Sequence, residues 1–322
     1  MSGPGKASFA VLAAAAAAAA GLAGAFNFTH KRRSPSPRSR PSMDSEQDRA
    51  CTARIHSGME WIAAQHAEPV SIQSFDGLTL RGLYLPAQNP RCCALLFHGY
   101  RSRGLREFSL LAPFYHSQGI SMLIPDQRAC GESDGTYITF GVLERRDAAD
   151  WAAYMDRRLG GKTPMILQGV SLGASTVMMA ADLPLPPSVG GIVADCGFTS
   201  PWDIIAHCAK QWYHLPPFPI LPLLSQLARH RLGFSYRDCS TLDSLAHSQL
   251  PLLLIHGGKD NFVPTHMTEE NFLAAAGWKR KLIVPEAGHA ASYLVDEAAC
   301  QRELLAFLNH ILQEEPPWQK NV

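Results

Sequence analysis

The sequence lacks a strong net charge and lacks the short motifs that bind nucleotides or metal ions. Its 322 residues carry a formal net charge of only +1, so no global field attracts nucleic acid or another strongly charged partner. It contains no G-x-x-x-x-G-K-S/T loop, no C-x-x-C pair and no H-E-x-x-H helix. We therefore expect no cofactor, no bound metal ion and no nucleic-acid partner.

The sequence also lacks the regular cysteine spacing of a disulfide framework. Its eight cysteines are scattered over the chain, at positions 51, 92, 93, 130, 196, 208, 239 and 300. Cys92 and Cys93 are adjacent in an apolar run, and neighbouring side chains of a strand point to opposite faces. This distribution is typical of small buried side chains, and it predicts free thiols in a reducing compartment.

Charge is absent from Ala7 to Phe28, a stretch that includes eight consecutive alanines. A helix of this length reaches about 33 Å, and a hydrocarbon core is about 30 Å thick. We expect residues 1–29 to be a membrane anchor, which makes the membrane a partner through this segment. More positive residues follow the segment than precede it, which predicts that the bulk of the protein lies on the cytoplasmic side. The alternative is secretion after signal-peptide cleavage near Ala23-Gly24-Ala25.

Beyond this segment the composition changes twice. Residues 30–46 include the Ser-, Pro- and Arg-rich stretch Ser34–Ser45, which predicts a flexible linker. The composition of residues 47–322 is typical of one globular domain. Within that domain, a region at about 199–241 is rich in aromatic residues and proline, and it is too long for an ordinary connection. It predicts a cap made of short helices.

The rest of the domain alternates between short apolar runs and helix-compatible segments. Asp76-Gly77 separates two alternating runs and predicts a hairpin. The apolar runs that follow predict strands at 92–97, 120–124, 165–167, 191–194, 252–255 and 281–284. Strands that alternate with helices form a mostly parallel sheet covered on both faces. The fold class is therefore α/β, with a small helical cap after the sixth strand.

The pentapeptide Gly169-Val170-Ser171-Leu172-Gly173 stands between a predicted strand and a predicted helix. This is the context of a nucleophile elbow, in which a serine sits on a sharp turn at the start of a helix. Glycines two residues before and after the serine remove side chains that would collide across the turn. The pattern predicts that Ser171 is a nucleophile and that backbone N–H groups beside it stabilise an oxyanion.

A serine nucleophile needs a base, and the base needs a group that orients it. In an open parallel sheet the chemistry lies at the carboxyl ends of the strands, which reduces the thirteen histidines to His98, His256 and His289. His289 follows the last strand and is the predicted base, whereas His98 and His256 are interpreted as turn structure. Asp260 is the predicted orienting acid, and Asp195 stays open as the alternative.

Five stretches in order give the chain a resemblance to a family: Phe97-His98-Gly99-Tyr100, Asp126 to Ser133, Gly169 to Gly173, His256 to Pro264 and Gly288-His289. Over residues 70 to 312 the chain resembles bacterial serine hydrolases of the α/β-hydrolase superfamily. It is most similar to membrane-anchored members akin to serine aminopeptidases, monoacylglycerol lipases and acyl esterases. One difference is Arg128-Ala129-Cys130-Gly131, where that family often has Arg-Gly-His-Gly, and it puts substrate size in question.

The resemblance implies the triad order Ser171, Asp260, His289 and an oxyanion hole built from the N–H groups of Tyr100 and Leu172. We expect a serine hydrolase that cleaves a small carboxylic ester, or an amide or peptide, through an acyl-enzyme on Ser171. Two alternatives stay open. One is a membrane-tethered binding protein that has kept the fold and lost activity, and the other is an acyltransferase that uses the same triad.

Overall fold

An eight-stranded sheet forms the centre of the computed structural model, which describes residues 4–33 and 46–313. The strand order is β1-β2-β4-β3-β5-β6-β7-β8. β2 runs antiparallel to β1 and to β4, and all pairs from β4 through β8 are parallel. The bounds are β1 Glu68–Gln73, β2 Thr79–Leu85, β3 Cys92–Phe97, β4 Ile120–Pro125, β5 Met165–Val170, β6 Val189–Asp195, β7 Leu252–Gly257 and β8 Lys279–Val284. This architecture confirms the predicted fold class.

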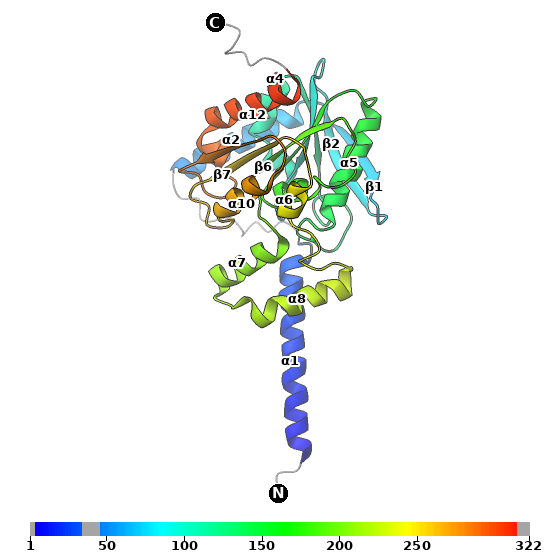
Figure 1. Ribbon diagram of the computed structural model, residues 1–322, viewed down its shortest axis with the longest axis vertical. Helices are drawn as coiled ribbons and strands as arrows, with labels where there is room; N and C mark the ends of the chain where they lie inside the picture. Colours follow the sequence, from blue (N-terminus) through cyan, green and yellow to red (C-terminus); the bar gives the residue numbers. More distant parts are fainter. Residues whose placement is uncertain (1–3, 34–45, 314–322) are drawn as a thin grey trace.

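The central strands are buried on both faces because helices cover each side of the sheet (Figure 1). Alternate side chains of β3 belong to separate cores: Cys93, Leu95 and Phe97 to one, Cys92, Ala94 and Leu96 to the other. The first core packs against α5 Glu144–Arg158, α6 Leu172–Met179, α9 Thr241–Ala246 and α10 His266–Ala274. The second packs against α2 Glu46–Ala63, α3 Gly104–Glu107, α4 Leu111–Ser117, α11 Ser292–Val295 and α12 Glu297–Ile311.

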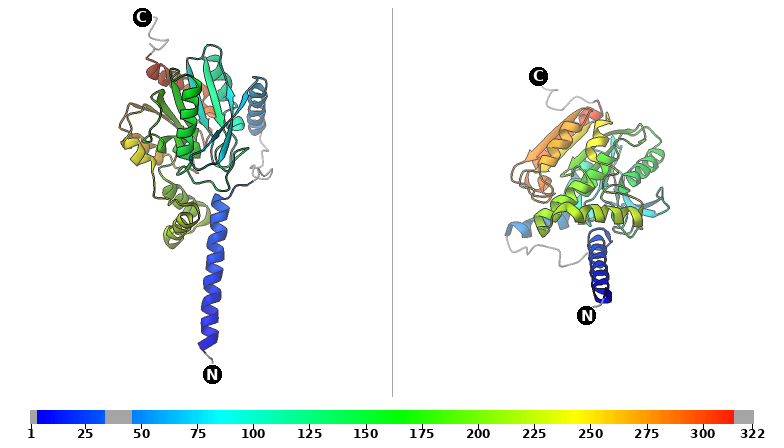
Figure 2. Two further views of the ribbon diagram at one scale, coloured as in Figure 1. Left: turned by 90° about the vertical axis from the view of Figure 1, so that its right-hand side faces the viewer. Right: turned by 60° about the horizontal axis from the view of Figure 1, so that its bottom comes forward.

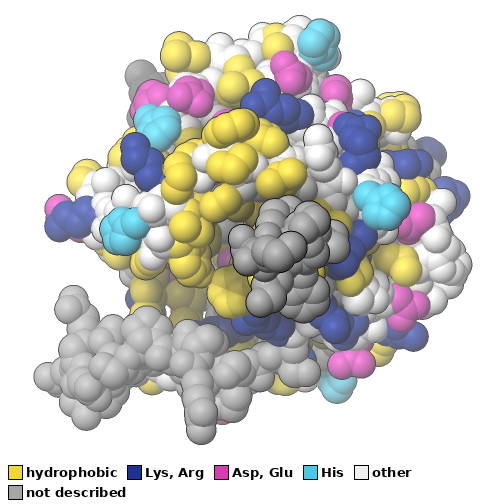
Figure 3. All heavy atoms as spheres, turned by 90° about the horizontal axis from the view of Figure 1, so that it is seen from below, with side chains coloured by type: hydrophobic (Ala, Val, Ile, Leu, Met, Phe, Trp, Pro, Cys, Tyr) yellow, Lys and Arg dark blue, Asp and Glu magenta, His cyan; other side chains and the backbone are white. Residues whose placement is uncertain are grey.

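A helical cap lies between β6 and β7, at the end of the domain from which the N-terminal helix projects (Figures 1 and 2). It consists of α7 Pro201–Tyr213 and α8 Pro217–Leu232. Ser200 caps α7 by accepting the N–H of Asp203, and Pro201 occupies the first turn. Hydrophobic side chains gather on the face seen in Figure 3. The cap exposes the large apolar side chains Trp212, Tyr213, Leu215, Phe218 and Leu223.

The N-terminal helix α1 Pro4–His30 projects from the domain, and its last turns are docked on it (Figure 2). Phe26 and His30 are both fully buried, in a third apolar core that also contains cap residues such as Leu221 and Leu224. The aromatic rings of Phe26 and His30 are stacked, with centroids 4.3 Å apart. Protein side chains therefore surround the end of α1.

The predicted membrane anchor over residues 1–29 is wrong, and so is the localisation inferred from it. Within residues 4–33 and 46–313, no helix has the length and apolarity to cross a membrane. The physical reason visible in the structure is that Phe26 is buried by the domain itself, where an anchor would place it against lipid. The predicted linker Ser34–Ser45 lies outside the described residues, and Lys31 pairs with Tyr137 in a short β-bridge.

Candidate active site

Ser171 occupies the sharp turn between β5 and α6. Its backbone has φ 54° and ψ −115°, a conformation that L-residues rarely adopt. The N–H of Ser171 donates to the carbonyl of Asp195 (2.8 Å), and its own carbonyl accepts the N–H of Ser175 (3.0 Å). These bonds hold the strained residue on both sides, at the carboxyl edge of the sheet and at the first turn of a buried helix.

Two glycines make this turn possible. A Cβ atom on Gly169 would lie 2.1 Å from the carbonyl carbon of Gly173, and a Cβ on Gly173 would lie 1.9 Å from the carbonyl oxygen of Phe97. Both contacts are with backbone atoms, which cannot swing aside as a flexible side chain can. The second contact also shows how closely the turn approaches the loop that follows β3.

The structure brings Ser171, His289 and Asp260 into one chain of hydrogen bonds. Nδ1 of His289 lies 2.7 Å from Oδ2 of Asp260, and Nε2 lies 2.9 Å from Oγ of Ser171. A carboxylate only accepts, so Nδ1 carries the proton and Nε2 of the neutral ring accepts from the Ser171 hydroxyl. Ser171 and Asp260 are buried, while the His289 side chain is 26% exposed. This order places an unprotonated ring nitrogen against a serine hydroxyl.

Asp260 is held as a carboxylate by several donors. Its Oδ1 accepts the N–H groups of Phe262 (2.8 Å) and Val263 (2.9 Å). Burial by itself would raise the pKa of Asp260, but hydrogen bonds from His256 and His289 and from Val263 outweigh burial and hold that pKa well below its usual range. Asp195, the alternative acid, accepts instead from the Ser292 hydroxyl (3.3 Å).

His256 is a partner of Asp260 that the sequence interpretation missed. Its Nε2 lies 3.2 Å from Oδ2 of Asp260 and 2.9 Å from the carbonyl of Val263, while its Nδ1 lies 2.6 Å from the Thr268 hydroxyl. Two acceptors face Nε2, so that nitrogen carries the proton and donates to both. The spacing His256 to Asp260 at the end of a strand was the available signal, because four residues of a tight loop can return to the strand end.

The loop after β3 lies against the elbow. A Cβ on Gly99 would be 3.4 Å from Cβ of Ser171 and 3.2 Å from Oε1 of Glu107. The N–H of Gly99 donates to Oε2 of Glu107 (3.0 Å), which fixes one end of the loop. The N–H of Tyr100 follows directly, and Leu172 begins α6 beside Ser171. We call residues 99–101 the β3 loop.

One group of side chains in the described part of the chain offers atoms that a metal ion could use. The atoms belong to Cys196, Asp260 and His289 and lie within 4.8 Å of one another. Burial raises the pKa of the Cys196 thiol well above its ordinary value, so that ligand would be protonated. Nδ1 of His289 is already bonded to Asp260. These residues suit a hydrogen-bonded chain better than a metal site.

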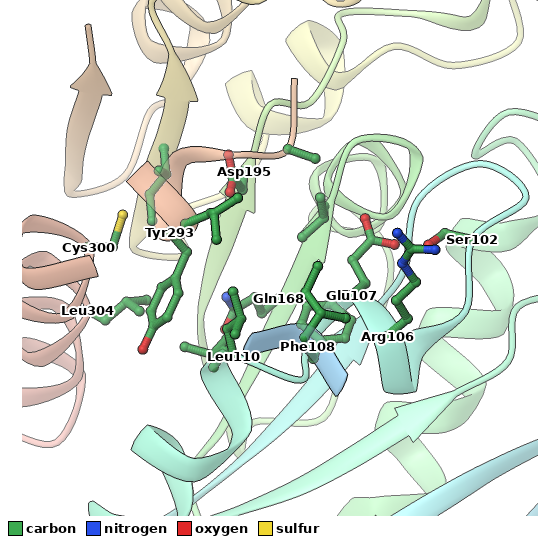
Figure 4. Close-up of a pocket in the computed structure, with 16 residues that line it drawn as sticks. Ser102, Arg106, Glu107, Phe108, Leu110, Gln168, Asp195, Tyr293, Cys300 and Leu304 are labelled. Atoms are coloured by element: carbon green, nitrogen blue, oxygen red, sulfur yellow. The ribbon is translucent and has the colours of Figure 1, made fainter. Parts of the chain in front are cut away.

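A cavity of about 290 Å³ lies against the same edge of the sheet, on the face covered by α2, α4 and α12 (Figure 4). Val170, Asp195 and Ala290 are among its lining residues, and the first and last of these adjoin Ser171 and His289 in the chain. Its polar wall includes Gln168, Glu107, Tyr293 and the buried Asp195. Burial raises the pKa of Asp195 to about 6.

Comparisons with known proteins agree with this fold. No protein-family model matches the chain. The uncharacterized protein YqkD of Bacillus subtilis is 24% identical over 240 residues, which cover 74% of this chain and 78% of YqkD.

Solved structures share the arrangement of strands and helices. The Pyrococcus furiosus esterase Pf2001 superposes with a TM-score of 0.62 at 21% identity, over 78% of this chain and 93% of that one. Pyrococcus horikoshii acylaminoacyl peptidase superposes with a TM-score of 0.59 at 15% identity, over 78% of this chain and 42% of that one. At these identities the likeness shows the fold alone, and the chain has the α/β-hydrolase fold.

Proposed function

We propose that this protein is a serine hydrolase that cleaves carboxylic esters through an acyl-enzyme on Ser171. The observation that carries the proposal is the hydrogen-bonded chain from Asp260 through His289 to Ser171, with 2.7 Å and 2.9 Å between the heavy atoms. The unprotonated Nε2 of His289 faces the hydroxyl from which a base must remove the proton. The strained backbone of Ser171 supports the same proposal, because such strain gathers at functional sites.

The reaction begins with proton transfer from Oγ of Ser171 to Nε2 of His289 as Oγ attacks the ester carbonyl carbon. Asp260 keeps Nδ1 protonated and stabilises the imidazolium that forms, and His256 keeps Asp260 ionised. When the tetrahedral intermediate collapses, Nε2 gives its proton to the leaving alkoxide. Water then attacks the acyl-enzyme, with Nε2 as base again. As the bond between the acyl carbon and Oγ of Ser171 breaks, Nε2 returns the proton to Oγ and the acid product leaves.

The negative charge that develops on the carbonyl oxygen needs donors fixed in advance. The N–H groups of Leu172 and Tyr100 supply them in this proposal, one at the start of α6 and one in the β3 loop. Leu172 belongs to the elbow itself, and Tyr100 belongs to the β3 loop that packs against the elbow, as the close approach of Gly99 to Ser171 indicates. Loss of one such donor typically costs about 3 kcal/mol of transition-state stabilisation.

The surroundings of His289 support an apolar substrate. The Phe262 ring lies 4.8 Å from the His289 ring, and Trp212 of the cap lies 6.3 Å from Phe262. These rings favour an ester with an apolar group. Two proteins with this fold are named an esterase and an acylaminoacyl peptidase, and these names support an ester or an amide as the substrate of this proposal. An amide or peptide substrate would use the same steps.

The decisive experiment is labelling of the folded, full-length protein with a fluorophosphonate probe, followed by identification of the modified residue. We expect covalent modification of Ser171 and none of the Ser171→Ala variant. Ser175, which lies one turn further along α6 and is fully buried, provides a matched control as Ser175→Ala. That variant is expected to be labelled at Ser171. A wild-type protein that stays unlabelled would contradict the proposal and favour a binding protein.

Substrate preference is then measured with p-nitrophenyl esters of rising acyl length beside an aminoacyl amide. We expect faster turnover of short esters than of the amide. Addition of a competing alcohol separates hydrolysis from acyl transfer. A product that carries the alcohol in place of the free acid, at low alcohol concentration, would favour the acyltransferase alternative.

A further inference from the structure

Residues 26–32 connect three parts of the molecule, and we call them the strap. The strap pairs with the loop after β4: the N–H of Ile138 donates to the carbonyl of His30 (2.7 Å), and the N–H of Arg32 donates to the carbonyl of Thr136 (2.7 Å). The guanidinium of Arg32 donates to the carbonyl of Ser133 (2.6 Å) in the same loop. These bonds span about a hundred residues of sequence, so the strap is a fixed part of the domain.

The strap also holds the β3 loop directly. The hydroxyl of Tyr100 donates to the carbonyl of Thr29 (2.6 Å). The guanidinium of Arg101 donates to the carbonyls of Phe28 (2.7 Å) and Lys31 (3.0 Å) at the end of α1. Arg101 has φ +55°, a conformation that costs free energy in any residue other than glycine. External contacts of this kind are what keep such a turn populated.

The third connection runs to the segment that follows the cap. The ring of His30 lies between Phe26 and Tyr236, with centroids 4.3 Å and 5.5 Å away and planes inclined by only 9°. Nε2 of His30 lies 3.1 Å from the Tyr236 hydroxyl. Burial lowers the pKa of His30 to about 4, so the ring is neutral near pH 7. Nδ1 lies 3.1 Å from the carbonyl of Phe26 and donates to it, so Nε2 accepts from the Tyr236 hydroxyl.

These contacts bear on the N–H of Tyr100, which the proposed mechanism uses as an oxyanion donor. The ring of Tyr100 stacks on Phe140 (5.5 Å, 22°), and its hydroxyl is fixed by Thr29. Glu107 fixes the preceding N–H at Gly99. With the ring, the hydroxyl and the preceding peptide all held, the N–H of Tyr100 keeps one direction. Donors help catalysis only when they are aimed before the charge develops.

We propose that the strap is a positioning element of the oxyanion hole, in which the Thr29 carbonyl holds Tyr100 and thereby aims its N–H. The inference rests on the proposed function, because it assigns a role within that reaction. It gives residues 26–32 a part in acyl transfer, in addition to any contribution to stability. Thr29 acts only through Tyr100, and its carbonyl touches no reacting atom.

The test is Tyr100→Phe, which keeps the ring, its stacking on Phe140 and the backbone N–H, and removes only the hydroxyl. On p-nitrophenyl butyrate we expect kcat to fall about 5- to 30-fold while KM stays within about twofold, because the lost interaction matters in the transition state. Titration of competent sites with the fluorophosphonate probe ensures that a partly unfolded sample is not mistaken for a slower one. Thermal unfolding of each variant is measured beside the kinetics.

The matched control is Tyr115→Phe. Tyr115 is fully buried and its hydroxyl donates to Gln168 (2.5 Å), but it packs in the core between α4 and the sheet. We expect this variant to lose stability and to keep the kcat of the wild type. Equal losses of kcat in the two variants would show a general effect of removing a buried hydroxyl, and they would overturn the inference.

A double-mutant cycle with Tyr236→Phe tests whether the effect runs through the strap. Tyr236→Phe removes the bond to His30 and is expected to lower kcat about two- to threefold. Because the strap is then already loosened, Tyr100→Phe should cost less in this background than in the wild type. If Tyr100→Phe lowers kcat by the same factor in the wild type and in Tyr236→Phe, the effect does not run through the strap.

Labelling of Ser171 tests the proposed function, and the kcat of Tyr100→Phe tests the role of the strap. If the probe labels wild-type Ser171 and Tyr100→Phe has the kcat of the wild type, the protein is a serine hydrolase and the strap does not position its oxyanion hole. If Tyr100→Phe raises KM and leaves kcat unchanged, the strap likewise does not position the oxyanion hole. If wild-type Ser171 is not labelled, the proposed function fails and the inference fails with it.

Discussion

The elbow around Ser171 and the end of α1 are both helix-forming segments rich in small apolar residues, yet their surroundings are specified in different ways. At the elbow, the glycines at 169 and 173 are required by backbone atoms within four residues or in the adjacent strand. At the end of α1, Phe26 and His30 are buried by residues more than a hundred positions away, such as Tyr236 and Phe140. Residues near the elbow in the sequence and the adjacent strand determine the surroundings of the elbow, whereas distant residues determine those of the end of α1.

This difference shows when the local composition of a segment predicts its surroundings in the fold. A run of alanines fits a lipid-facing helix, an exposed helix or a docked one equally well, because alanine has little apolar surface to bury. The larger side chains at the end of the run decide among these, and they do so through partners that the local pattern does not reveal. A strained serine between two glycines has few alternatives, because only a sharp turn requires that pattern.

The largest expected effect tests the elbow. Ser171→Ala should lower kcat on a p-nitrophenyl ester about 10⁴-fold or more, since the nucleophile is lost. Asp260→Asn should lower it about 10³-fold or more, because Nδ1 of His289 would face an amide and the ring would change tautomer. Steady-state kinetics with titrated enzyme measures both. An Asp260→Asn enzyme with near wild-type kcat would shift the role of the acid to Asp195.

The second prediction compares glycines in the two regions. Gly169→Ala forces a Cβ to within 2.1 Å of the Gly173 backbone, and we expect a loss of about 3 kcal/mol in the free energy of unfolding together with a large loss of activity. Gly24 in α1 is exposed and has nothing within 4 Å of its Cβ position. Gly24→Ala should therefore leave stability unchanged or raise it by about 0.5 kcal/mol. Chemical denaturation measures the free energy of unfolding of both variants. Equal losses in the two variants would contradict the prediction.

Much of the fold follows from sequence patterns whose physical basis is local. The apolar run at 92–97 indicated a strand buried on both faces, and Asp76-Gly77 indicated the hairpin of β1 and β2. The order of Ser171, Asp260 and His289 pointed to residues that the structure places in one chain of hydrogen bonds. Their roles stay predictions until the serine is labelled.

Contacts between distant loops could not be predicted in the same way. That His256 shares Asp260 with His289 depends on how tightly the loop after β7 returns to the strand end. That Tyr100 bonds to Thr29 depends on where α1 ends, and the incorrect membrane interpretation removed α1 from the domain altogether. Both are pairings of a side chain with a partner whose position only the assembled sheet defines.

The third prediction tests the docking of α1. Phe26 is fully buried, and Phe26→Ala should lower the free energy of unfolding by about 3 kcal/mol through lost burial and the cavity left behind. Phe28 lies on the same turn and is 47% exposed, so Phe28→Ala should cost less than about 1 kcal/mol. Calorimetric unfolding of full-length variants measures the difference. Equal, small costs would mean that the end of α1 is not docked in solution.

The smallest expected effect concerns Asp195, whose carboxyl lies in the wall of the cavity. Burial raises its pKa from 3.8 to about 6, so between these values the folded protein binds more protons than the unfolded chain. The stability that comes from the protonated carboxyl is therefore present at low pH and is lost as the pH rises through about 6. Asp195→Asn removes this dependence. It should raise stability at pH 7.5 by up to about 2 kcal/mol and leave it unchanged near pH 4.

The same substitution sharpens the comparison with the elbow, because Asp195 also holds the Ser171 N–H through its backbone carbonyl, which asparagine keeps. If Asp195 serves only as a buried carboxyl, the variant gains stability above pH 6 and its kcat stays within about threefold of the wild type. Thermal unfolding from pH 4 to 8 and kinetics at pH 7.5 give both quantities. If the stability of the variant relative to the wild type falls as the pH rises from 4 to 8, the bond from Ser292 outweighs the cost of burying the charge, and the assigned direction of the pH dependence is wrong.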